Sequence, residues 1–317
     1  MAVTLEQFKK STTDKVVEGF INEIQADSAF LDALLFDDVV SPNGGSNLNY
    51  VYTRELTGST AAFRALNTEY TPDEAEIEQV VTELAILGGS FQIDRVVANA
   101  TSGSRIVDQM SFQLAAKRRA VIQGYYNALI NGDTGTDANA FDGLKKALAN
   151  GDQELTSAID VSDAAKMDDA KMAFADEMDR LIMALDGMPG FIIANRSMKG
   201  KIAGIARRLG VYQATATDAG ARVETSDGIP FFDPGQFGAN DIIPVTEGKT
   251  DIYAVRIGID GLHGLSVDGG KLVDIYTPDL TAPGAVKLGE VEFVCGMALK
   301  KQKAAAVLKG IQVAPAA

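Results

Sequence analysis

The chain has 317 residues, 46% of them apolar, and a formal net charge of −14. Such a composition supports a substantial core and excludes global disorder. The acidity argues against direct binding of duplex nucleic acid, because such binding is stabilised by lysine and arginine side chains that neutralise the phosphates. Aromatic residues make up only 7% and tryptophan is absent, which argues against stacking platforms for single-stranded nucleic acid.

The N-terminal region is predicted to form an amphipathic arm. Apolar residues recur with roughly helical spacing between Phe8 and Ile24, and a second apolar stripe runs from Phe30 to Leu35. The first twenty residues lack the apolar core of a signal peptide. The sequence contains no run of 18 apolar residues, so we expect no membrane span.

An extended two-stranded ribbon is predicted over residues 46–94. Two extended runs, Leu48–Thr57 and Ile77–Val97, flank a polar middle that includes the turn-prone Thr71–Asp73. The segment carries eight acidic and two basic side chains, a balance of −6. Because a two-stranded ribbon is marginal on its own in water, this arm is expected to need a partner, often a second copy of the same chain.

A long amphipathic helix is predicted over residues 104–130. Apolar residues at helical spacing line one side of it: Ile106, Met110, Leu114, Val121, Tyr125 and Leu129. The pair Asn131–Gly132 is a natural C-terminal stop. About 27 residues give a rod of roughly 40 Å. The surrounding segment 95–131 has a balance of +4, opposite in sign to the ribbon.

The opposite charges of ribbon and helix suggest an interface between subunits. The candidate residues are Glu69, Asp73, Glu74 and Glu76 on the ribbon and Lys117, Arg118 and Arg119 on the helix of a neighbouring copy. Each exposed pair contributes only about 0–1 kcal/mol, so together they would set register and partner choice. The alternative is that both surfaces are solvated, since consecutive positions spread around a helix. Three basic residues are weak evidence for a nucleic-acid patch.

Residues 150–290 alternate between helix and strand signals. Amphipathic helices are predicted over Ser162–Leu185 and Ser197–Leu209. Strands are predicted over Phe191–Ala194, Ile229–Phe232, Ile242–Val245, Ile252–Ile259, Gly289–Leu299 and Ala304–Val313.

The sequence lacks the common catalytic motifs. The sequence has no phosphate-binding loop, no GxSxG elbow and no HExxH motif. Its single cysteine, Cys295, lies in a strand-like run and is predicted to be a small buried hydrophobe. A catalytic pair of Cys295 with His263, the single histidine, is an alternative that we disfavour. Acidic pairs such as Asp37–Asp38 fit solvated surfaces. We therefore predict no catalytic, cofactor-binding or metal-binding residue, and no cofactor.

The order of these segments resembles the major capsid protein of tailed double-stranded DNA bacteriophages, whose fold is shared with encapsulins. The resemblance covers essentially the whole chain. The most specific local match is the helix end Leu129–Asp133, followed closely by Phe141–Leu144. Other short motifs are diffuse, so the order of segments carries most of the weight.

The resemblance implies an α+β fold with five parts. They are an N-arm (1–45), an extended β-ribbon loop (46–94), a peripheral domain with a spine helix (95–149), an α/β axial domain (150–281) and a C-terminal return to the peripheral domain (282–317). Some members begin with a helical scaffolding segment that a protease removes. Because Met1 lies almost at the start of the arm, we expect no such segment here, and we expect no Lys–Asn crosslink.

The implied function is structural rather than enzymatic. Hexamers and pentamers of the chain would form an icosahedral virion shell, assembled in the host bacterial cytoplasm, around double-stranded DNA that is not bound sequence-specifically. A separate scaffolding protein, a portal and a decoration protein are further candidate partners. One alternative is an encapsulin-like nanocompartment that encloses an enzyme. Another is a cytoplasmic α/β enzyme built on residues 150–290, with the ribbon as a dimerisation arm.

Overall fold

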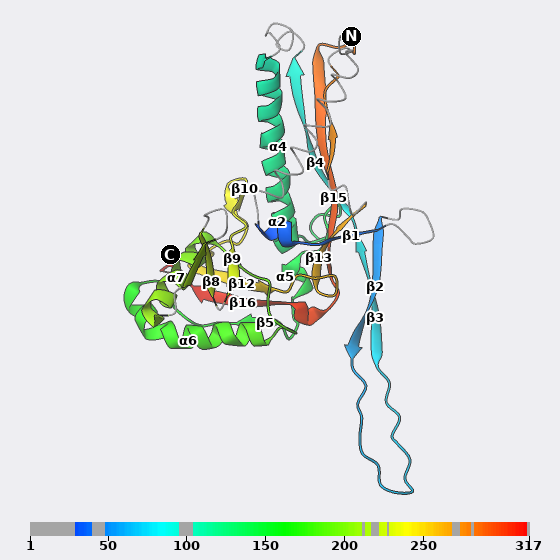
Figure 1. Cartoon of the computed structure of the whole chain (residues 1–317), viewed down its shortest axis with the longest axis vertical. Helices are drawn as coiled ribbons and strands as arrows, with labels where there is room; N and C mark the ends of the chain where they lie inside the picture. The colour runs from blue at the N-terminus through cyan, green and yellow to red at the C-terminus, as the bar shows by residue number, and fades with distance from the viewer. Residues whose placement is uncertain are drawn as a thin grey trace.

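The computed structural model describes residues 29–39, 48–94, 104–210, 213–216, 222–226, 228–267, 273–279 and 282–315. Its helices are α2 (Ala29–Ala33), α4 (Ser104–Asn131), α5 (Leu144–Ala147), α6 (Ala164–Met183) and α7 (Arg196–Leu209), with a 3-10 turn at Gln302–Ala304. The helical stripe predicted between Phe8 and Ile24 lies outside these residues. Figure 1 shows an upright unit of α4 with long strands, a lobe that holds α6 and α7, and a ribbon that projects away from both.

Within the described ranges, the strands form two large sheets and two separate two-stranded pairs. The five-stranded sheet contains β1 (Phe36–Asp38), β4 (Ala85–Asp94), β13 (Leu262–Ser266), β14 (Asp274–Tyr276) and β15 (Val286–Leu299). The seven-stranded sheet contains β5 (Glu154–Thr156), β6 (Phe191–Ala194), β7 (Gln213–Ala216), β8 (Arg222–Ser226), β9 (Ile229–Phe232), β12 (Lys249–Val255) and β16 (Ala305–Gln312). The pairs are β2 (Asn49–Thr57) with β3 (Glu76–Glu83), and β10 (Gln236–Phe237) with β11 (Asn240–Asp241).

The five-stranded sheet is organised around β15. Strand β4 follows one edge of β15 over ten registered pairs, from Val286–Asp94 to Cys295–Ala85, while β13 and β14 share the other edge. Residues of β15 alternate between a buried and a more exposed side, as expected for a sheet with one covered face. The buried side includes Phe293 and Cys295, so the prediction that Cys295 is a small buried hydrophobe is confirmed.

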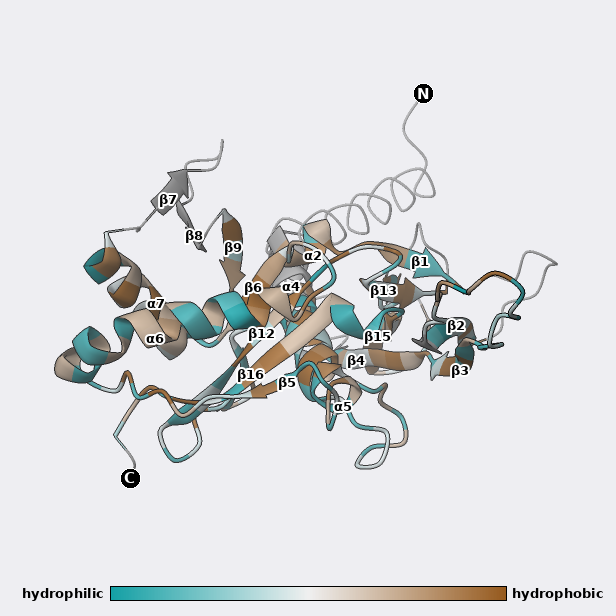
Figure 2. Cartoon of the chain, turned by 90° about the horizontal axis from the view of Figure 1, so that it is seen from below, coloured by the Kyte–Doolittle hydropathy of each residue, from teal (hydrophilic) through white to brown (hydrophobic). Residues whose placement is uncertain are grey.

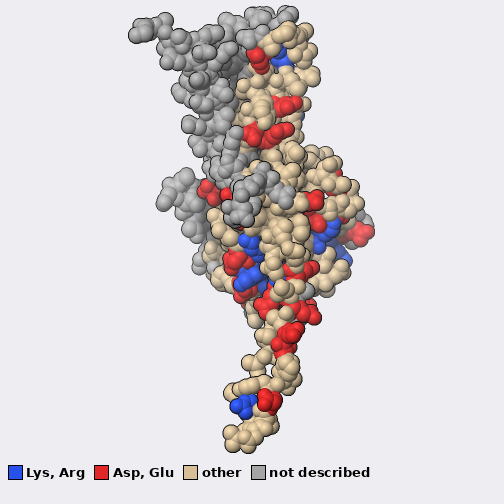
Figure 3. All heavy atoms as spheres, turned by 90° about the vertical axis from the view of Figure 1, so that its right-hand side faces the viewer, with Lys and Arg blue, Asp and Glu red and all other residues tan. Residues whose placement is uncertain are grey.

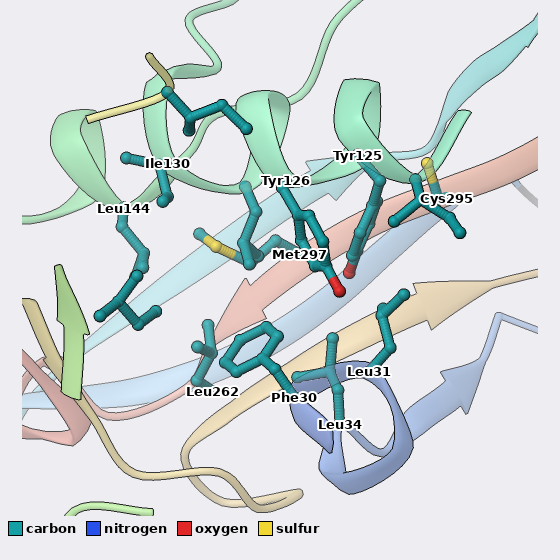
Figure 4. Close-up of a cluster of buried hydrophobic side chains, with 14 of the residues drawn as sticks. Phe30, Leu31, Leu34, Tyr125, Tyr126, Ile130, Leu144, Leu262, Cys295 and Met297 are labelled. Atoms are coloured by element: carbon teal, nitrogen blue, oxygen red, sulfur yellow. The ribbon is translucent and has the colours of Figure 1, made fainter. Parts of the chain in front are cut away.

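Helix α4 covers this buried side, and its bounds agree with the predicted 104–130. Figure 4 shows Tyr125 and Tyr126 of α4 pointing toward Cys295 and Met297 of β15 and toward the side chains of α2. Among the latter, Phe30 is fully buried. Each such fully buried apolar side chain stabilises the fold by roughly 1.5–3 kcal/mol. The core therefore joins the N-terminal segment, the long helix and the C-terminal strand.

The turn after α4 explains the residues of the most specific sequence match. The backbone N–H of Gly143 donates to the carbonyl oxygen of Gly132 at 2.8 Å, and Gly132 N–H donates to Ala128 O at 2.9 Å. The backbone is so close here that a Cβ on Gly143 would lie 2.5 Å from Ala128 O. The side chain of Lys146 pairs with Asp142 at 2.9 Å on the solvent side. The two glycines are thus required by close backbone contact.

The extended run predicted over Ile77–Val97 is not one ribbon strand, which corrects the prediction. It divides at Leu84: β3 pairs with β2 in the ribbon, whereas β4 pairs with β15 in the five-stranded sheet. Leu84 is buried at the junction. A Cβ on Gly88 would lie within 3 Å of the Val291 carbonyl oxygen, so a glycine there permits close pairing with β15. Continuous strand propensity does not reveal such a change of partner.

The seven-stranded sheet has the order β5-β16-β12-β6-β9-β8-β7. Strand β6 is buried along its length because both of its faces are covered. Ile192 and Ala194 join a cluster with α6 and α7, whereas Phe191 and Ile193 join the cluster beneath α4. Helix α6 begins at its N-cap Asp163, which accepts a hydrogen bond from the Lys166 amide. Figure 2 shows α6 and α7 beside this sheet, at the opposite end of the molecule from the ribbon.

One further prediction about this region is wrong. Residues Ile242–Val245 do not form a strand: Ile242 and Ile243 are buried at a bend, Pro244 is exposed and Val245 is half-buried. Side-chain amides satisfy their carbonyl groups instead: Asn131 Nδ2 donates to Ile242 O at 2.7 Å, and Asn195 Nδ2 donates to Ile243 O at 3.2 Å. This buried stretch therefore resembles a strand in composition without taking part in a ladder.

The predicted boundary between residues 281 and 282 does not separate the two sheets. Strands β13 and β14 lie before it but pair with β15 in the five-stranded sheet. Strand β16 lies after it but pairs with β12 and β5 in the seven-stranded sheet. The chain crosses between the sheets several times, and the fixed order of segments in the sequence cannot show these crossings.

Candidate interaction surface

The ribbon has two distinct faces because side chains alternate along paired strands. Strands β2 and β3 are antiparallel, and their ladder runs from Asn49–Glu83 to Thr57–Glu76. One face, which includes Tyr50 and Tyr52, is half-buried against the body. The other face is exposed and carries three large apolar side chains, Val51, Ile77 and Val81.

Two tyrosines hold the ribbon root on the body. The hydroxyl of Tyr50 donates to Asp37 Oδ2 at 2.7 Å, and the hydroxyl of Tyr52 donates to the Leu299 carbonyl oxygen at 3.0 Å. Both rings pack on a buried cluster that includes Leu84. Burial, and for Tyr50 also the hydrogen bond to Asp37, raises the pKa of both phenols. Both hydroxyls therefore stay protonated and continue to donate.

Clefts of about 700 and 620 Å³ border the ribbon where it leaves the body. Arg54 lines both clefts, and its guanidinium pairs with Glu78 across the ribbon at 2.6 Å. Charged groups in the larger cleft also pair with each other, as Lys301 does with Asp186 at 3.0 Å. The clefts thus resemble gaps beside a projecting arm more than a site with polar groups that converge on a substrate.

The ribbon tip, residues 58–75, is exposed at every position. Its shape is held by local contacts: the amide and hydroxyl of Thr60 both donate to Asp73 Oδ2 at 2.6 Å, and Arg64 lies over the Tyr70 ring at 5.3 Å. The side chains of Phe63 and Leu66 contact almost nothing in the chain, with exposures of 108% and 89%. Two large apolar side chains are therefore presented to an outside partner.

The four acidic candidate residues all lie on the tip or beside it. Glu69 and Glu74 are exposed, and Glu76 is the exposed first residue of β3. The hydrogen bonds from Thr60 hold the pKa of Asp73 below its usual range. Asp73 is therefore ionised, but its carboxylate already accepts hydrogen bonds within the tip. Figure 3 shows acidic side chains gathered along the ribbon.

The three basic candidate residues do not form one patch on α4. Lys117 is half-buried and lies across β4, where a Cβ on Gly89 would be 3.4 Å from its Nζ atom. Arg118 is half-buried, and burial together with neighbouring Arg119 lowers its pKa. Only Arg119 among the three is exposed. Within one chain the helix and the ribbon tip lie at opposite ends (Figure 1), so contact between these sets requires two copies.

The residues considered for catalysis are not assembled into a site. His263 pairs with Ala298 and Ser266 with Cys295 in the antiparallel β13–β15 ladder, so His263 and Cys295 point to opposite faces of the sheet. Burial raises the pKa of the Cys295 thiol, which opposes formation of a nucleophilic thiolate. Among the described residues, no three acidic, histidine or cysteine side chains are grouped to hold a metal ion.

Within the same ranges, no helix is both long and apolar enough for a membrane span.

Solved structures of shell proteins resemble this chain over most of its length. The SrpI encapsulin of Synechococcus elongatus matches 89% of this chain and 87% of its own, with 16% identity and a TM-score of 0.60. The virus-like particle of Pyrococcus furiosus matches 93% and 98%, with 12% identity and a TM-score of 0.52. The capsid of Myoviridae phage XM1 matches 86% and 89%, with 13% identity and a TM-score of 0.53.

No protein-family model matches the sequence, and no curated protein matches it. The likeness is therefore one of fold, and the predicted resemblance to capsid proteins and encapsulins is confirmed at that level. The chain has a mixed α+β structure with the capsid fold that these shell proteins share.

Sequence reasoning missed the apolar part of this surface. Phe63 and Leu66 lie in the largely apolar run Ala61–Leu66, inside the segment predicted to be the polar middle of the ribbon. Two large apolar residues in a loop are a signal for contact with a partner. The alternation of Tyr50 and Tyr52 in β2 would have identified the face turned to the body. Asp37, expected to be solvated, instead accepts the Tyr50 hydroxyl.

Proposed function

We propose that the chain is a structural subunit of a closed protein shell, in the role of a major capsid protein. The observation that carries the proposal is a two-stranded ribbon whose tip and outer face have no partner in the described chain, on a body with the fold of phage capsid and encapsulin subunits. The structural neighbours are shell proteins, and the proposal includes no catalytic step.

The ribbon supplies the main contact between copies in this proposal. A two-stranded ribbon is marginal alone in water, and burying its outer face and tip on a neighbour would remove Phe63, Leu66 and Val81 from water. A ribbon of one copy on the body of the next is a heterologous contact, which closes into rings when the rotation permits. Rings of five and six would tile an icosahedral shell, with α4 as the spine of a peripheral domain and the α6–α7 lobe as the axial domain.

The acidity of the chain suits a container for nucleic acid. At a formal net charge of −14, an inner surface repels phosphate and does not hold a packaged genome tightly. We therefore propose double-stranded DNA as the content, a virion capsid as the location and the host bacterial cytoplasm as the place of assembly. A scaffolding protein, a portal and a decoration protein are the further partners that such a shell would use.

An encapsulin-like nanocompartment is the second candidate function. It is favoured by the likeness to the SrpI encapsulin, whose TM-score of 0.60 exceeds the 0.53 for the phage XM1 capsid. The two candidates share the subunit geometry and differ in content. Mass spectrometry and nucleic-acid staining of shells purified from the native source separate them, because one predicts DNA inside and the other a cargo enzyme.

Negative-stain electron microscopy of the purified chain, expressed alone, is the direct test of the shell. We expect closed particles of uniform size or free rings of five and six after size-exclusion chromatography. A monomer or dimer under these conditions calls for co-expression with a scaffolding protein from the same genome. If that second preparation also yields only small oligomers that bind a small ligand, the cytoplasmic enzyme replaces the shell.

The charge contact between ribbon and helix also becomes testable at defined residues. We propose that Arg119, the exposed member of the basic set, contacts Glu74 or Glu76 of a neighbouring ribbon. Arg119→Glu should slow assembly at low salt, since each exposed pair contributes only about 0–1 kcal/mol but recurs at every interface. Light scattering during assembly measures the rate. Restoration by Glu74→Lys or Glu76→Lys in the same chain would support the contact, and a normal rate for Arg119→Glu alone would contradict it.

A further inference from the structure

His263, the single histidine of the chain, lies beneath the ribbon root. Its side chain in β13 is fully buried, and neither ring nitrogen makes a hydrogen bond of good geometry, although the backbone of Gly258 and Gly261 lies near the ring. This is unusual, because buried polar groups are normally paired. The ring meets that of Tyr50 edge-on, with the ring centres 5.9 Å apart. His263, a titratable residue, therefore packs directly against Tyr50, the residue that holds the ribbon on the body.

The charged groups that act on the ring are Asp37 and Lys300, and the backbone of Gly258 and Gly261 lies near it as well. Strand β1 contributes Asp37, which accepts the Tyr50 hydroxyl, and β2 contributes Tyr50 with Tyr52 on the same face. The segment after β15 contributes Lys300, whose Nζ lies 3.9 Å from Asp37 Oδ2 and 5.3 Å from the centre of the Tyr50 ring. A protonated imidazole would be stabilised by the face of the Tyr50 ring and by the Asp37 carboxylate. Lys300 already interacts with both.

The surroundings favour a neutral imidazole. Burial, and after it the positive charge of Lys300, lowers the pKa of His263 below its ordinary value. A proton added to the closed arrangement would place a second cation beside Lys300 in a contact from which water is excluded. A ring that had moved into water would accept the same proton near its ordinary pKa of about 6.5.

We propose that His263 is a proton-sensitive latch for the ribbon. In its neutral form the ring packs beneath Tyr50 and holds the ribbon root on the body; when it takes up a proton, the root is released and the imidazolium reaches water. The clefts of about 700 and 620 Å³ are lined by Lys300 and by Tyr52, respectively, so the neighbours of this contact border open space. All these contacts lie within one chain, so the latch does not depend on the proposed shell.

The direction of the pH dependence follows from proton linkage. The released state binds the proton more tightly than the closed state, so the closed state is favoured above about pH 6.5 and loses stability as the pH falls below that value. Until the buried ring itself is protonated, the ratio of released to closed root rises by up to about tenfold per pH unit, the slope for uptake of one proton.

Hydrogen exchange of the full chain, followed by mass spectrometry between about pH 7.5 and about pH 5, tests the latch. After correction for the chemical exchange rate, we expect amides of residues 49–53 and 80–84 to lose protection as the pH falls, while those of β12 and β16 keep theirs. In His263→Phe the root should keep its protection at all these pH values, because phenylalanine preserves the packing but cannot take up a proton.

Two controls make the outcome decisive. Tyr52→Phe removes the hydrogen bond to Leu299 without changing a group that titrates in this range, so it should raise root exchange equally at every pH. If His263→Phe fails to fold, His263→Gln is used with the same criterion. The latch is overturned if the wild-type root shows no pH dependence, or if the histidine-free variant keeps that dependence, because a group other than His263 would then be responsible.

Discussion

Replacing the ribbon tip, residues 58–75, with an Asn-Gly turn will give a folded chain that does not form shells. The β2–β3 ladder ends at the Thr57–Glu76 pair, so this replacement leaves every registered pair in place. Asn-Gly favours the tight turn whose twist matches that of paired strands. Because every residue removed is exposed, we expect the free energy of unfolding of the unassembled chain to change by no more than about 0.5 kcal/mol.

The loss of assembly follows from what the tip presents. Phe63 and Leu66 are the most exposed large apolar side chains of the described chain, and each would contribute roughly 1.5–3 kcal/mol when fully buried on a neighbour. In a shell this contribution recurs at every subunit. Electron microscopy and light scattering will report the absence of particles, and circular dichroism will report the intact fold.

Point variants separate the length of the tip from its apolar character. Phe63→Ser with Leu66→Ser keeps the tip at full length and should also abolish shells. Ala61→Ser with Ala62→Ser is the matched control, since it makes two equally exposed positions of the same tip more polar and should leave assembly unchanged. Shells of wild-type size from the tip replacement would show that the ribbon does not join subunits.

The elements that were predicted well are those whose signal is local. Helix α4 has a long apolar stripe and a clear stop, and its bounds differ from the predicted ones by a single residue. Helices α6 and α7 begin at side-chain caps, Asp163 and Asn195, that lie within two residues of the predicted starts, Ser162 and Ser197. Caps and periodicity act over a few residues, so one sequence contains the information needed to place such elements.

The features that were missed depend on distant partners. Strand β4 looks like a continuation of β3, yet it pairs with β15, almost two hundred residues further along the chain. The Ile242–Ile243 stretch resembles a strand until the amides of Asn131 and Asn195 reach its carbonyl groups. The same holds for the interaction surface. Its charges were visible in the sequence, but the burial of Lys117 against β4 and of His263 beneath Tyr50 needed the fold.

Gly143→Ala will destabilise the chain by about 2–3 kcal/mol, at the upper end of the range for overpacked sites. Gly143 has φ −91° and ψ 179°, which any residue adopts, so conformational freedom is not the reason for glycine here. The reason is contact: a Cβ would lie 2.5 Å from Ala128 O, 2.8 Å from Gly132 N and 2.9 Å from Leu129 O. All three atoms belong to the backbone, so no side chain can move aside to make room.

Accommodating the methyl group must separate the end of α4 from the turn that follows it. This weakens the hydrogen bond from Gly143 N–H to Gly132 O and partly uncovers Leu144, which is fully buried. Gly200→Ala in α7 is the matched control, because nothing lies within 4 Å of its added Cβ. Alanine there should stabilise the helix by up to about 1 kcal/mol.

Denaturant unfolding of unassembled protein, followed by circular dichroism, will compare the two alanine variants without contributions from contacts between copies. Equal stability of Gly143→Ala and the wild type would mean that the turn relaxes at little cost. The glycines of the helix end and of Phe141–Leu144 would then lack a packing explanation. The expected loss would instead show that both glycines are required by backbone contact at the end of the long helix, because a methyl group at Gly143 cannot be accommodated without separating α4 from its turn.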